Sequence, residues 1–399
     1  MTAHRRISIM GSTGSIGTSA LDVVAQANMA GETPFEIVAL TAGSDSETLA
    51  RQAIEFRPDI AVIADESKLA DLRDRLAGTG IETAGGLDAM IEAATRPCDR
   101  VLAAIVGSAG LASTLAAVRQ GTDVAIANKE SIVCGGKLIL SEAARTGARV
   151  LPVDSEHSGI FQALGDGRSL EKLTITASGG PFRTATLSEM AVVTPQQAAA
   201  HPNWDMGIKN SIDSATLMNK ALEFIEAAYL FDVAADQIDV LVHPQSIIHG
   251  MAHFTDGSVI AQLSTPDMRA PIAYALGWPD RVATNVARLD LAALGRLDFA
   301  VVDAARFPAI ELARRAIALG AGGTTVLNCA NELAVSAFIA GQCGFLDISW
   351  VVEEVLSRFS SGNQAALPCD TLDEIAYLDR FGREMAAELL KKAPSRAGG

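Results

Sequence analysis

The sequence predicts an α/β protein with an N-terminal doubly wound, Rossmann-like domain, a central α+β domain and a C-terminal helical bundle domain. Three observations predict this class. Short apolar strands alternate with helical patterns through residues 1–149, a glycine-rich turn follows the first strand, and residues 305–393 carry helical patterns only. A chain of 399 residues is long enough for two or three domains.

The first domain is expected to contain a parallel sheet. Its strands read as nearly continuous apolar runs, and helical patterns such as 15–27 and 47–56 lie between them. Such strands with helical crossovers are typical of a sheet covered on both faces, the layout of nucleotide-binding domains. The expected strands are Ile7–Met10, Glu36–Leu40, Ile60–Ala64, Val101–Val106, Asp123–Ala127 and Arg149–Val153.

The segment Gly11-Ser-Thr-Gly14-Ser-Ile-Gly17 follows the first strand and opens a helix. Glycines allow a tight turn and a close approach to a pyrophosphate, and the helix start offers free N–H groups. The pattern favours nucleotide binding over a purely structural turn. No acid follows the second strand at 40–43, and Ser44 could bond a 2′-phosphate, which favours NADP over NAD. Asp45 points the other way, and a plain helix cap is the alternative for both residues.

Two groups of polar residues could bind a hard cation and a phosphate. Asp154 and Glu156 follow a strand and are two residues apart, so both carboxylates should share a face, as Mg²⁺ or Mn²⁺ ligands do. In the segment 211–223, Asn219 and Glu223 are four apart on a helix with Lys220 beside them. With Ser214 in the first turn they would form a phosphate cradle, and Glu223 a third metal ligand. Solvated polar surfaces are the alternative for both groups.

Further polar positions surround these groups. Asn128 and Lys129 follow a strand at its carboxyl end, where cofactor and substrate bind in doubly wound sheets, although a plain helix start would look the same. Residues 178–207 form a long polar loop that is expected to act as a lid, and Trp204 in it could instead serve local packing. His249 and His253 are interpreted as packing or hydrogen-bonding residues.

The later chain divides into a central domain, residues 150–279, a linker, residues 280–304, and the helical domain, residues 305–393. In the central domain, Thr255-Asp-Gly-Ser258 between two strand patterns predicts a hairpin. A helix is expected over 214–230. The C-terminal helices are expected at 309–319, 326–339, 350–359 and 375–391.

Composition excludes several classes of function. The formal net charge of −15 argues against nucleic acid or an anionic membrane as the main partner. The five cysteines include no CxxC pair, which suits a reducing cytoplasm. The uncharged stretch 101–118 reads as strand, turn and helix, so no membrane span is expected.

Together these segments resemble 1-deoxy-D-xylulose 5-phosphate reductoisomerases. The resemblance rests on an ordered set along nearly the whole chain: GSTGSIG (11–17), VGSAGL (106–111), ANKES (127–131), PVDSEH (152–157), SGGPF (178–182), HPNWDMG (201–207), DSATLMNKALE (213–223), HPQSIIHG (243–250) and LNCANELAV (327–335). It implies an NADPH- and divalent-metal-dependent enzyme that converts 1-deoxy-D-xylulose 5-phosphate, a sugar phosphate, to 2-C-methyl-D-erythritol 4-phosphate in non-mevalonate isoprenoid synthesis. It also implies a cytoplasmic homodimer.

The resemblance also implies roles for individual residues. The metal, Mg²⁺ or Mn²⁺ with Co²⁺ as a third option, would be held by Asp154, Glu156 and Glu223. The catalytic set would be Lys129, Glu156, His201 and Glu223. The substrate would be bound by these residues together with Ser155, Ser178, Trp204, Ser214, Asn219 and Lys220. NADPH would be bound by Thr13, Gly14, Ser15, Ile16, Gly43, Ser44, Asp45, Asn128, Glu130 and Gly207. Ser44 and Asp45 depart from the Lys and Asn that are often found at these positions in relatives.

Two other functions remain open on sequence alone. A semialdehyde-dehydrogenase-like NADP oxidoreductase would need an activated cysteine nucleophile, and Cys134 has no obvious base beside it. A non-catalytic NADPH-binding sensor would not need three converging carboxylates. Dependence on a divalent ion would separate the reductoisomerase from both.

Overall fold

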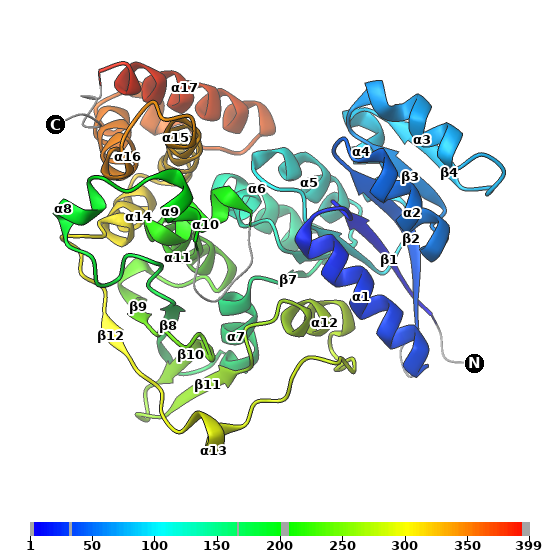
Figure 1. Cartoon of the computed structure of the whole chain (residues 1–399), viewed down its shortest axis with the longest axis horizontal. Helices are drawn as coiled ribbons and strands as arrows, with labels where there is room; N and C mark the ends of the chain where they lie inside the picture. Colours follow the sequence, from blue (N-terminus) through cyan, green and yellow to red (C-terminus); the bar gives the residue numbers. More distant parts are fainter. Residues whose placement is uncertain (1–3, 32–33, 166, 201–206, 393–399) are drawn as a thin grey trace. The chain divides into compact units, whose positions relative to one another are not determined.

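The computed structural model describes residues 4–31, 34–165, 167–200 and 207–392, and the chain forms two compact units (Figure 1). Unit 1 consists of Met1–Ser131, Leu138–Ser158 and Asp267–Arg288. Unit 2 consists of Ile132–Lys137, Gly159–Pro266 and Leu289–Gly399. Helices α6 (Lys129–Thr146) and α7 (Ser155–Leu164) each contribute residues to both units.

A seven-stranded parallel sheet forms the centre of unit 1, with the order β4-β3-β2-β1-β5-β6-β7. The chain leaves β1 on one side and returns to its other side for β5, which confirms the doubly wound prediction. The gap between β1 and β5 is the switch point where such sheets bind ligands. The strands are β1 (Arg5–Met10), β2 (Phe35–Ala42), β3 (Ile60–Ile63), β4 (Glu82–Gly85), β5 (Arg100–Ala103), β6 (Asp123–Ile126) and β7 (Val150–Pro152).

Helices pack on this sheet through their apolar faces. Helix α1 buries Ala20, Val23, Val24 and Ala27 and packs against α12, while α4 packs against α5. These helices and the short 3₁₀ turns between them are α1 (Ser15–Ala30), α2 (Ser46–Phe56), η1 (Glu66–Lys68), α3 (Leu69–Arg75), α4 (Leu87–Thr95), η2 (Ser108–Gly110), α5 (Leu111–Arg119) and α12 (Arg269–Gly277).

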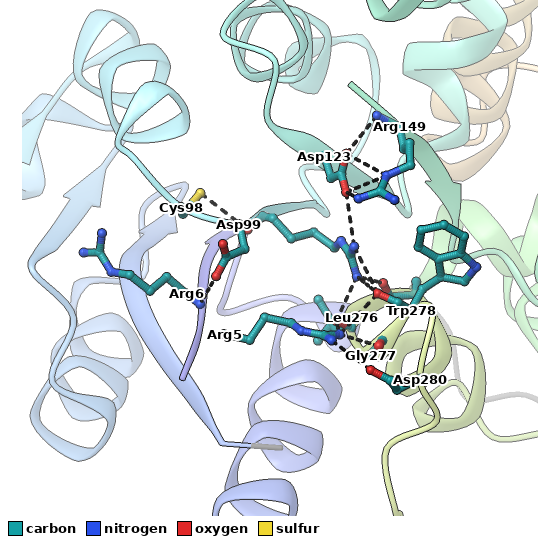
Figure 2. Close-up of polar contacts among 12 residues, drawn as sticks. Arg5, Arg6, Cys98, Asp99, Asp123, Arg149, Leu276, Gly277, Trp278 and Asp280 are labelled. Carbon is teal, nitrogen blue, oxygen red and sulfur yellow. Dashed lines mark hydrogen bonds and ion pairs between the residues drawn. The ribbon is translucent and has the colours of Figure 1, made fainter. Parts of the chain in front are cut away.

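Two arginines at the amino ends of β1 and β5 hold the end of α12 to unit 1. Arg100, only 4% exposed, donates to the carbonyl oxygens of Ala275 at 2.6 Å and Leu276 at 2.9 Å. Arg5 donates to the carbonyls of Leu276 and Gly277 (Figure 2). These are the carbonyls that a helix leaves unpaired at its C-terminus, where a cation is also favoured by the helix dipole. We call Arg5 and Arg100, together with the α12 carbonyl oxygens that they bind, the arginine clamp.

Asp123 completes the arginine clamp from the amino end of β6. Its carboxylate lies 3.3 Å from the Arg100 guanidinium and 2.6 Å from that of Arg149. Arg149 in turn lies over the Trp278 ring, 4.6 Å from the centroid, as Figure 2 shows. Hydrogen bonds from both arginines lower the pKa of Asp123 against the opposing effect of its burial. The buried Arg100 therefore has a charged partner as well as carbonyl acceptors.

Unit 2 is built on a mixed sheet with the order β11-β10-β8-β9-β12. Strands β8 and β9 are parallel, and the other pairs are antiparallel. The predicted hairpin is confirmed between β10 and β11, with Gly257 at φ +85° in its turn. The strands are β8 (Leu170–Ala177), β9 (Ile238–Val242), β10 (Ile248–Phe254), β11 (Val259–Leu263) and β12 (Ala300–Val301).

The helices of unit 2 include the predicted C-terminal bundle. Helix α15 packs against α14, α16 and α17, and also contacts α10 and α11 beside the sheet. Within the described residues, no helix is both long and apolar enough to cross a bilayer. The helices and 3₁₀ turns are α8 (Leu187–Met190), α9 (Pro195–Ala199), α10 (Ile208–Ala215), α11 (Met218–Leu230), η3 (Ala235–Gln237), α13 (Leu291–Leu294), α14 (Ala309–Ala318), α15 (Ala321–Ile339), α16 (Phe345–Ser360), η4 (Asn363–Ala366) and α17 (Leu372–Leu390).

The compact units do not follow the expected domain boundaries. The helices after residue 305 belong to the same unit as the central sheet, because α14 and α15 pack on α11. Residues 267–288, expected in the central domain and linker, belong to unit 1 through the arginine clamp. The remainder of the expected linker contains α13 and the edge strand β12, which pairs with β9.

Candidate active site

The glycine turn, Gly11–Gly17, connects β1 to α1 beside the switch point of unit 1. Gly11 has φ +90°, a conformation that glycine adopts without strain. A Cβ atom on Gly17 would lie 2.3 Å from the Gly11 carbonyl oxygen, so only glycine allows α1 to begin this close to the turn. Gly14 and Ser15 are exposed at the start of the helix, where N–H groups favour an anion. The strand–turn–helix context that the motif requires is confirmed.

Two residues that sequence analysis missed fix this turn. Thr41, at the end of β2, accepts from the Gly11 N–H through its hydroxyl at 2.9 Å and from the Ser12 N–H through its carbonyl at 2.7 Å. Gln52 exchanges two hydrogen bonds with Ser12, at 2.7 and 2.9 Å. Gln52 is 6% exposed among the apolar residues of α2, and a polar residue on an apolar helix face was the available signal.

The end of β2 presents Gly43, Ser44 and Asp45, all of which are exposed. Asp45 caps α2, because its carboxylate accepts from the Thr48 N–H at 2.9 Å. That hydrogen bond holds the pKa of Asp45 below its usual range. The plain-cap interpretation of Asp45 is thus correct, and the residue also places an ionised carboxylate at the edge of the predicted cofactor site.

Asn128 joins two loops at the carboxyl edge of the same sheet. Its Oδ1 caps α6 by accepting from the Ser131 N–H at 2.7 Å, and its Nδ2 donates to the carbonyls of Ile105 and Gly107. The Asn128 amide also lies 3.3 Å from the buried Glu130 carboxylate. Both residues therefore shape the loop that follows β5.

The structure brings Lys129 and Asp154 together as an ion pair in unit 1. The side chains are 16% and 13% exposed, so the pair is largely shielded from solvent. The sequence suggested strand-like spacing for Asp154 and Glu156. In the structure, however, the two residues lie at the start of a helix. Strand β7 ends at Pro152, and Asp154 starts α7 by accepting from the Ser158 N–H through its carbonyl at 2.8 Å. Ser155 donates to the Glu156 carboxylate at 2.5 Å in the first turn.

In unit 2, Ser178 follows β8 in a turn that requires glycine. Gly179 and Gly180 have φ of +84° and +64°. A Cβ on Gly180 would lie 2.7 Å from the Ser214 carbonyl oxygen, so this turn lies directly against the end of α10. Ser178 and Ser214, both predicted to bind phosphate, are therefore on adjoining segments.

The expected helix over 214–230 is two helices. Leu217 has φ +61° and separates α10 from α11, a left-handed conformation that costs a non-glycine residue about 1–2 kcal/mol. Ser214 consequently lies in the last turn of α10, not in the first turn of a longer helix as predicted. Asn219 and Lys220 lie in the first turn of α11. We call Ser214–Lys220 the α10–α11 turn.

Glu223 is the centre of a buried polar group on α11. Lys220 donates to one of its carboxylate oxygens at 2.5 Å, and Asn219 donates to the other. Glu223 is 1% exposed and Lys220 is 6% exposed. The predicted common face of these three residues is confirmed. The Glu223 carboxylate orients both the Lys220 ammonium group and the Asn219 amide.

The expected lid segment, residues 178–207, is not structureless. It contains α8 and α9, each opened by a capping box, Thr186 with Glu189 and Thr194 with Gln197. These Thr-x-x-Glu/Gln patterns were visible in the sequence. His201 and Trp204 lie outside the described residues. Gly207 is exposed and precedes α10.

His249, His253 and the cysteines of the described residues behave as structural residues. His253 forms a 2.8 Å hydrogen bond with Thr174, and His249 lies 3.3 Å from the Ser264 carbonyl oxygen. All five cysteines are free thiols, and burial raises the pKa of Cys343 to about 12 and of Cys369 to about 11. Such thiols are not activated nucleophiles.

Comparison with known proteins assigns the whole chain to one family. The family model for 1-deoxy-D-xylulose 5-phosphate reductoisomerase matches residues 7–136, and models for C-terminal domains of the same enzyme match residues 150–231 and 263–385. A reductoisomerase of that name from Rhodospirillum centenum is 52% identical over 97% of this chain and 94% of its own length. One from Caulobacter vibrioides is 50% identical over 100% and 99%.

Solved structures agree with this assignment. The reductoisomerase from Zymomonas mobilis in complex with NADPH is 44% identical with a TM-score of 0.90, covering 98% of this chain and 100% of that one. A reductoisomerase in complex with NADPH, fosmidomycin and magnesium is 39% identical with a TM-score of 0.92 and the same coverage. With the glycine turn, the paired Lys129 and Asp154 and the α10–α11 turn all in place, the chain belongs to the 1-deoxy-D-xylulose 5-phosphate reductoisomerase family.

Proposed function

We infer that this chain catalyses the NADPH- and divalent-metal-dependent isomerisation and reduction of 1-deoxy-D-xylulose 5-phosphate to 2-C-methyl-D-erythritol 4-phosphate, a step of non-mevalonate isoprenoid biosynthesis. The observation that carries this function is the match to reductoisomerases at about half identity over the full chain. One of the solved relatives is a complex with NADPH, and another is a complex with NADPH, fosmidomycin and magnesium.

The metal ligands in this proposal are Asp154, Glu156 and Glu223. Each offers one carboxylate oxygen, the hard ligand that Mg²⁺ and Mn²⁺ prefer, and Co²⁺ is a third option. Glu223 suits this role because its carboxylate is 1% exposed, and a buried carboxylate is stabilised by positive charge beside it. Lys129 forms an ion pair with Asp154 and so places a positive charge beside this proposed ligand.

The substrate phosphate would be bound by Ser178 and by Ser214, Asn219 and Lys220 of the α10–α11 turn. Hydroxyl, amide and ammonium donors on adjoining segments of unit 2 suit a phosphate, and a phosphate far from the reacting carbons orients them. Lys129, Ser155, Glu156, His201, Trp204 and Glu223 would contact the rest of the substrate. Of these, Lys129, Glu156, His201 and Glu223 are the proposed catalytic set.

Unit 1 is the proposed NADPH-binding part. Its glycine turn offers backbone N–H groups to the pyrophosphate through Thr13, Gly14, Ser15 and Ile16. The proposed contacts at the neighbouring loops and in unit 2 are Gly43, Ser44, Asp45, Asn128, Glu130 and Gly207.

When bound, the metal ion supplies Lewis acidity to the substrate oxygens, and NADPH supplies the hydride.

Three further features belong to the proposal. Residues 178–207 would close over the bound substrate, which protects a reactive intermediate from water. The partner would be a small sugar phosphate and a second copy of the chain, not nucleic acid or a membrane, as the net charge of −15 supports. A reducing, cytoplasmic location is supported by the five free thiols.

The two alternatives are not favoured. A semialdehyde-dehydrogenase-like enzyme needs an activated thiolate, whereas Cys134 is buried and burial raises the pKa of Cys343 and Cys369. A sensor without catalysis would not need the buried Glu223 with its two donors.

Oxidation of NADPH in the presence of 1-deoxy-D-xylulose 5-phosphate tests the function. Turnover should require a divalent ion, stop with a chelator and return with added Mg²⁺. Turnover that persists in the chelator would contradict the metal-dependent proposal.

A further inference from the structure

A buried hydrogen bond links the α10–α11 turn to the C-terminal bundle. Asn331 on α15 donates through Nδ2 to the Asp213 carboxylate on α10 at 2.8 Å. Asp213 is 1% exposed and Asn331 is 0% exposed. The other Asp213 oxygen lies 2.9 Å from the Lys209 ammonium group. A carboxylate that is buried this deeply holds its neighbours firmly, because losing a partner leaves an unpaired charge.

Asp213 precedes Ser214, so whatever fixes Asp213 also fixes the first residue of the α10–α11 turn. The Ser214 carbonyl lies against Gly180 of the Ser178 turn, where a Cβ atom would be only 2.7 Å away. On its other side, the left-handed Leu217 must be held by its surroundings, since leucine does not favour φ +61° by itself. The position of the Ser214 hydroxyl therefore depends on external contacts to the end of α10.

We propose that Asn331 and Asp213 are positioning residues. Through them, the C-terminal bundle holds the α10–α11 turn in the conformation that binds phosphate. The inference rests on the proposed phosphate role of Ser214. Asn331 itself touches neither Ser214 nor any other proposed phosphate ligand in the contacts described, and acts through Asp213. Its Oδ1 atom has no hydrogen-bond partner in the described part of the chain, so the amide is retained at a cost to stability.

The helix offers a matched control one turn earlier. Asn328 is also 0% exposed and also has a buried Oδ1 without a partner among the described residues. Its Nδ2 donates to Glu332 of the same helix at 3.3 Å, not to α10. Asn328→Ala therefore removes a similar side chain from the same core without touching Asp213.

The test compares Asn331→Ala with Asn328→Ala in the full-length enzyme. We expect Asn331→Ala to raise the KM for the sugar phosphate about tenfold, because one charge-assisted hydrogen bond is lost. The KM for NADPH should be unchanged. Asn328→Ala should change neither KM. The two variants should have similar Tm values, because both truncate a buried amide with an unpaired oxygen.

Asp213→Asn tests the same hydrogen bond without a change in volume, should Asn331→Ala fail to fold. It turns a charge-assisted bond into a neutral one, so the KM for the sugar phosphate should rise by a smaller factor, about threefold. Equal KM values for wild type, Asn331→Ala and Asp213→Asn would overturn the inference, as would equal KM changes in the Asn331 and Asn328 variants.

Ser214→Ala separates this inference from the function on which it rests. If Ser214→Ala raises the KM for the sugar phosphate and Asn331→Ala does not, only the positioning role is wrong. If Ser214→Ala leaves that KM unchanged, the phosphate assignment of the turn is wrong and the positioning role falls with it.

Discussion

The glycine turn of unit 1 and the α10–α11 turn of unit 2 are the two proposed sites for phosphate groups, and they are built differently. The glycine turn offers backbone N–H groups, and its shape is fixed by close packing, such as the missing Cβ of Gly17, and by neutral hydrogen bonds to Thr41 and Gln52. The α10–α11 turn offers side chains, and buried charged groups, Asp213 and Glu223, fix its shape. The glycine turn therefore depends on residues without a Cβ atom, and the α10–α11 turn depends on buried charged side chains.

This difference has a consequence for how each site fails. A backbone cradle is lost when a side chain is added, because the turn has no room to adjust. A side-chain cradle is lost when a charge is removed, because its buried partners are left without compensation. The predictions below break one site while leaving the other intact.

The largest effect is expected from Glu223→Gln in unit 2. The change keeps the volume but removes a proposed metal ligand and the negative partner of Lys220. Turnover at limiting Mg²⁺ should fall about a hundredfold or more, with NADPH binding retained. Measurement of kcat against Mg²⁺ concentration checks this, with the exposed Glu311→Gln as control. Normal turnover at limiting Mg²⁺ would remove Glu223 from the metal site.

Gly17→Ala should break the other site. The new Cβ would lie 2.3 Å from the Gly11 carbonyl oxygen, so the turn must move. The free energy of unfolding should fall by about 1–3 kcal/mol, and the KM for NADPH should rise about tenfold while that for the sugar phosphate changes little. Thr18→Ala, at the next and exposed position of α1, is the control. A Gly17→Ala enzyme with wild-type affinity for NADPH would show that the cofactor does not use this turn.

Asp45→Asn should give a small gain in affinity for NADPH. NADPH should be preferred over NADH in the wild type, and the Asp45 carboxylate should oppose the 2′-phosphate. Asparagine caps a helix equally well, so removal of the charge should lower the KM for NADPH about two- to fivefold. Because the pKa of Asp45 is lowered, its carboxylate is ionised throughout pH 5–8, so the gain should grow as the 2′-phosphate takes its second charge at about pH 6.

The control for this change is Asp65→Asn, at a half-buried cap at the start of η1 after β3. Both variants lose one surface carboxylate near the same sheet edge, but only Asp45 follows β2. A wild-type preference for NADH that disappears in Asp45→Asn would show that the carboxylate binds the ribose.

Sequence patterns predicted the parts of the fold that are determined locally. Strands of unit 1 were recognised as buried apolar runs, whereas β4 was missed because its residues, Glu82-Thr-Ala-Gly85, are partly exposed and polar at the sheet edge. The glycine turn was recognised because its motif and its structural context are adjacent in sequence. The common face of Asn219, Lys220 and Glu223 followed from helix spacing alone.

The remaining errors concern features that depend on tertiary contacts. Leu217 gives no local signal for a left-handed break, so α10 and α11 read as one helix and Ser214 was placed at the wrong end. Asp154 and Glu156 were expected to follow a strand with strand-like spacing, because the apolar run before them gave a stronger signal than Asp154 as a possible helix cap. Asp213 and Asn331 are 118 positions apart, and no periodicity indicates that they meet.

The arginine clamp implies an order of assembly during synthesis. Arg5 and Arg100 bond to carbonyls that are made 271 and 175 positions later, after strands β8 to β11 of unit 2 have been translated. Until residue 278 leaves the ribosome, the N-terminal sheet has its strands, but the Arg100 guanidinium lacks the α12 carbonyl acceptors that it has in the folded chain. The first part of the enzyme to be made is therefore among the last to be completed, and a fragment ending at residue 158 would be a less stable protein than the same residues within the full chain.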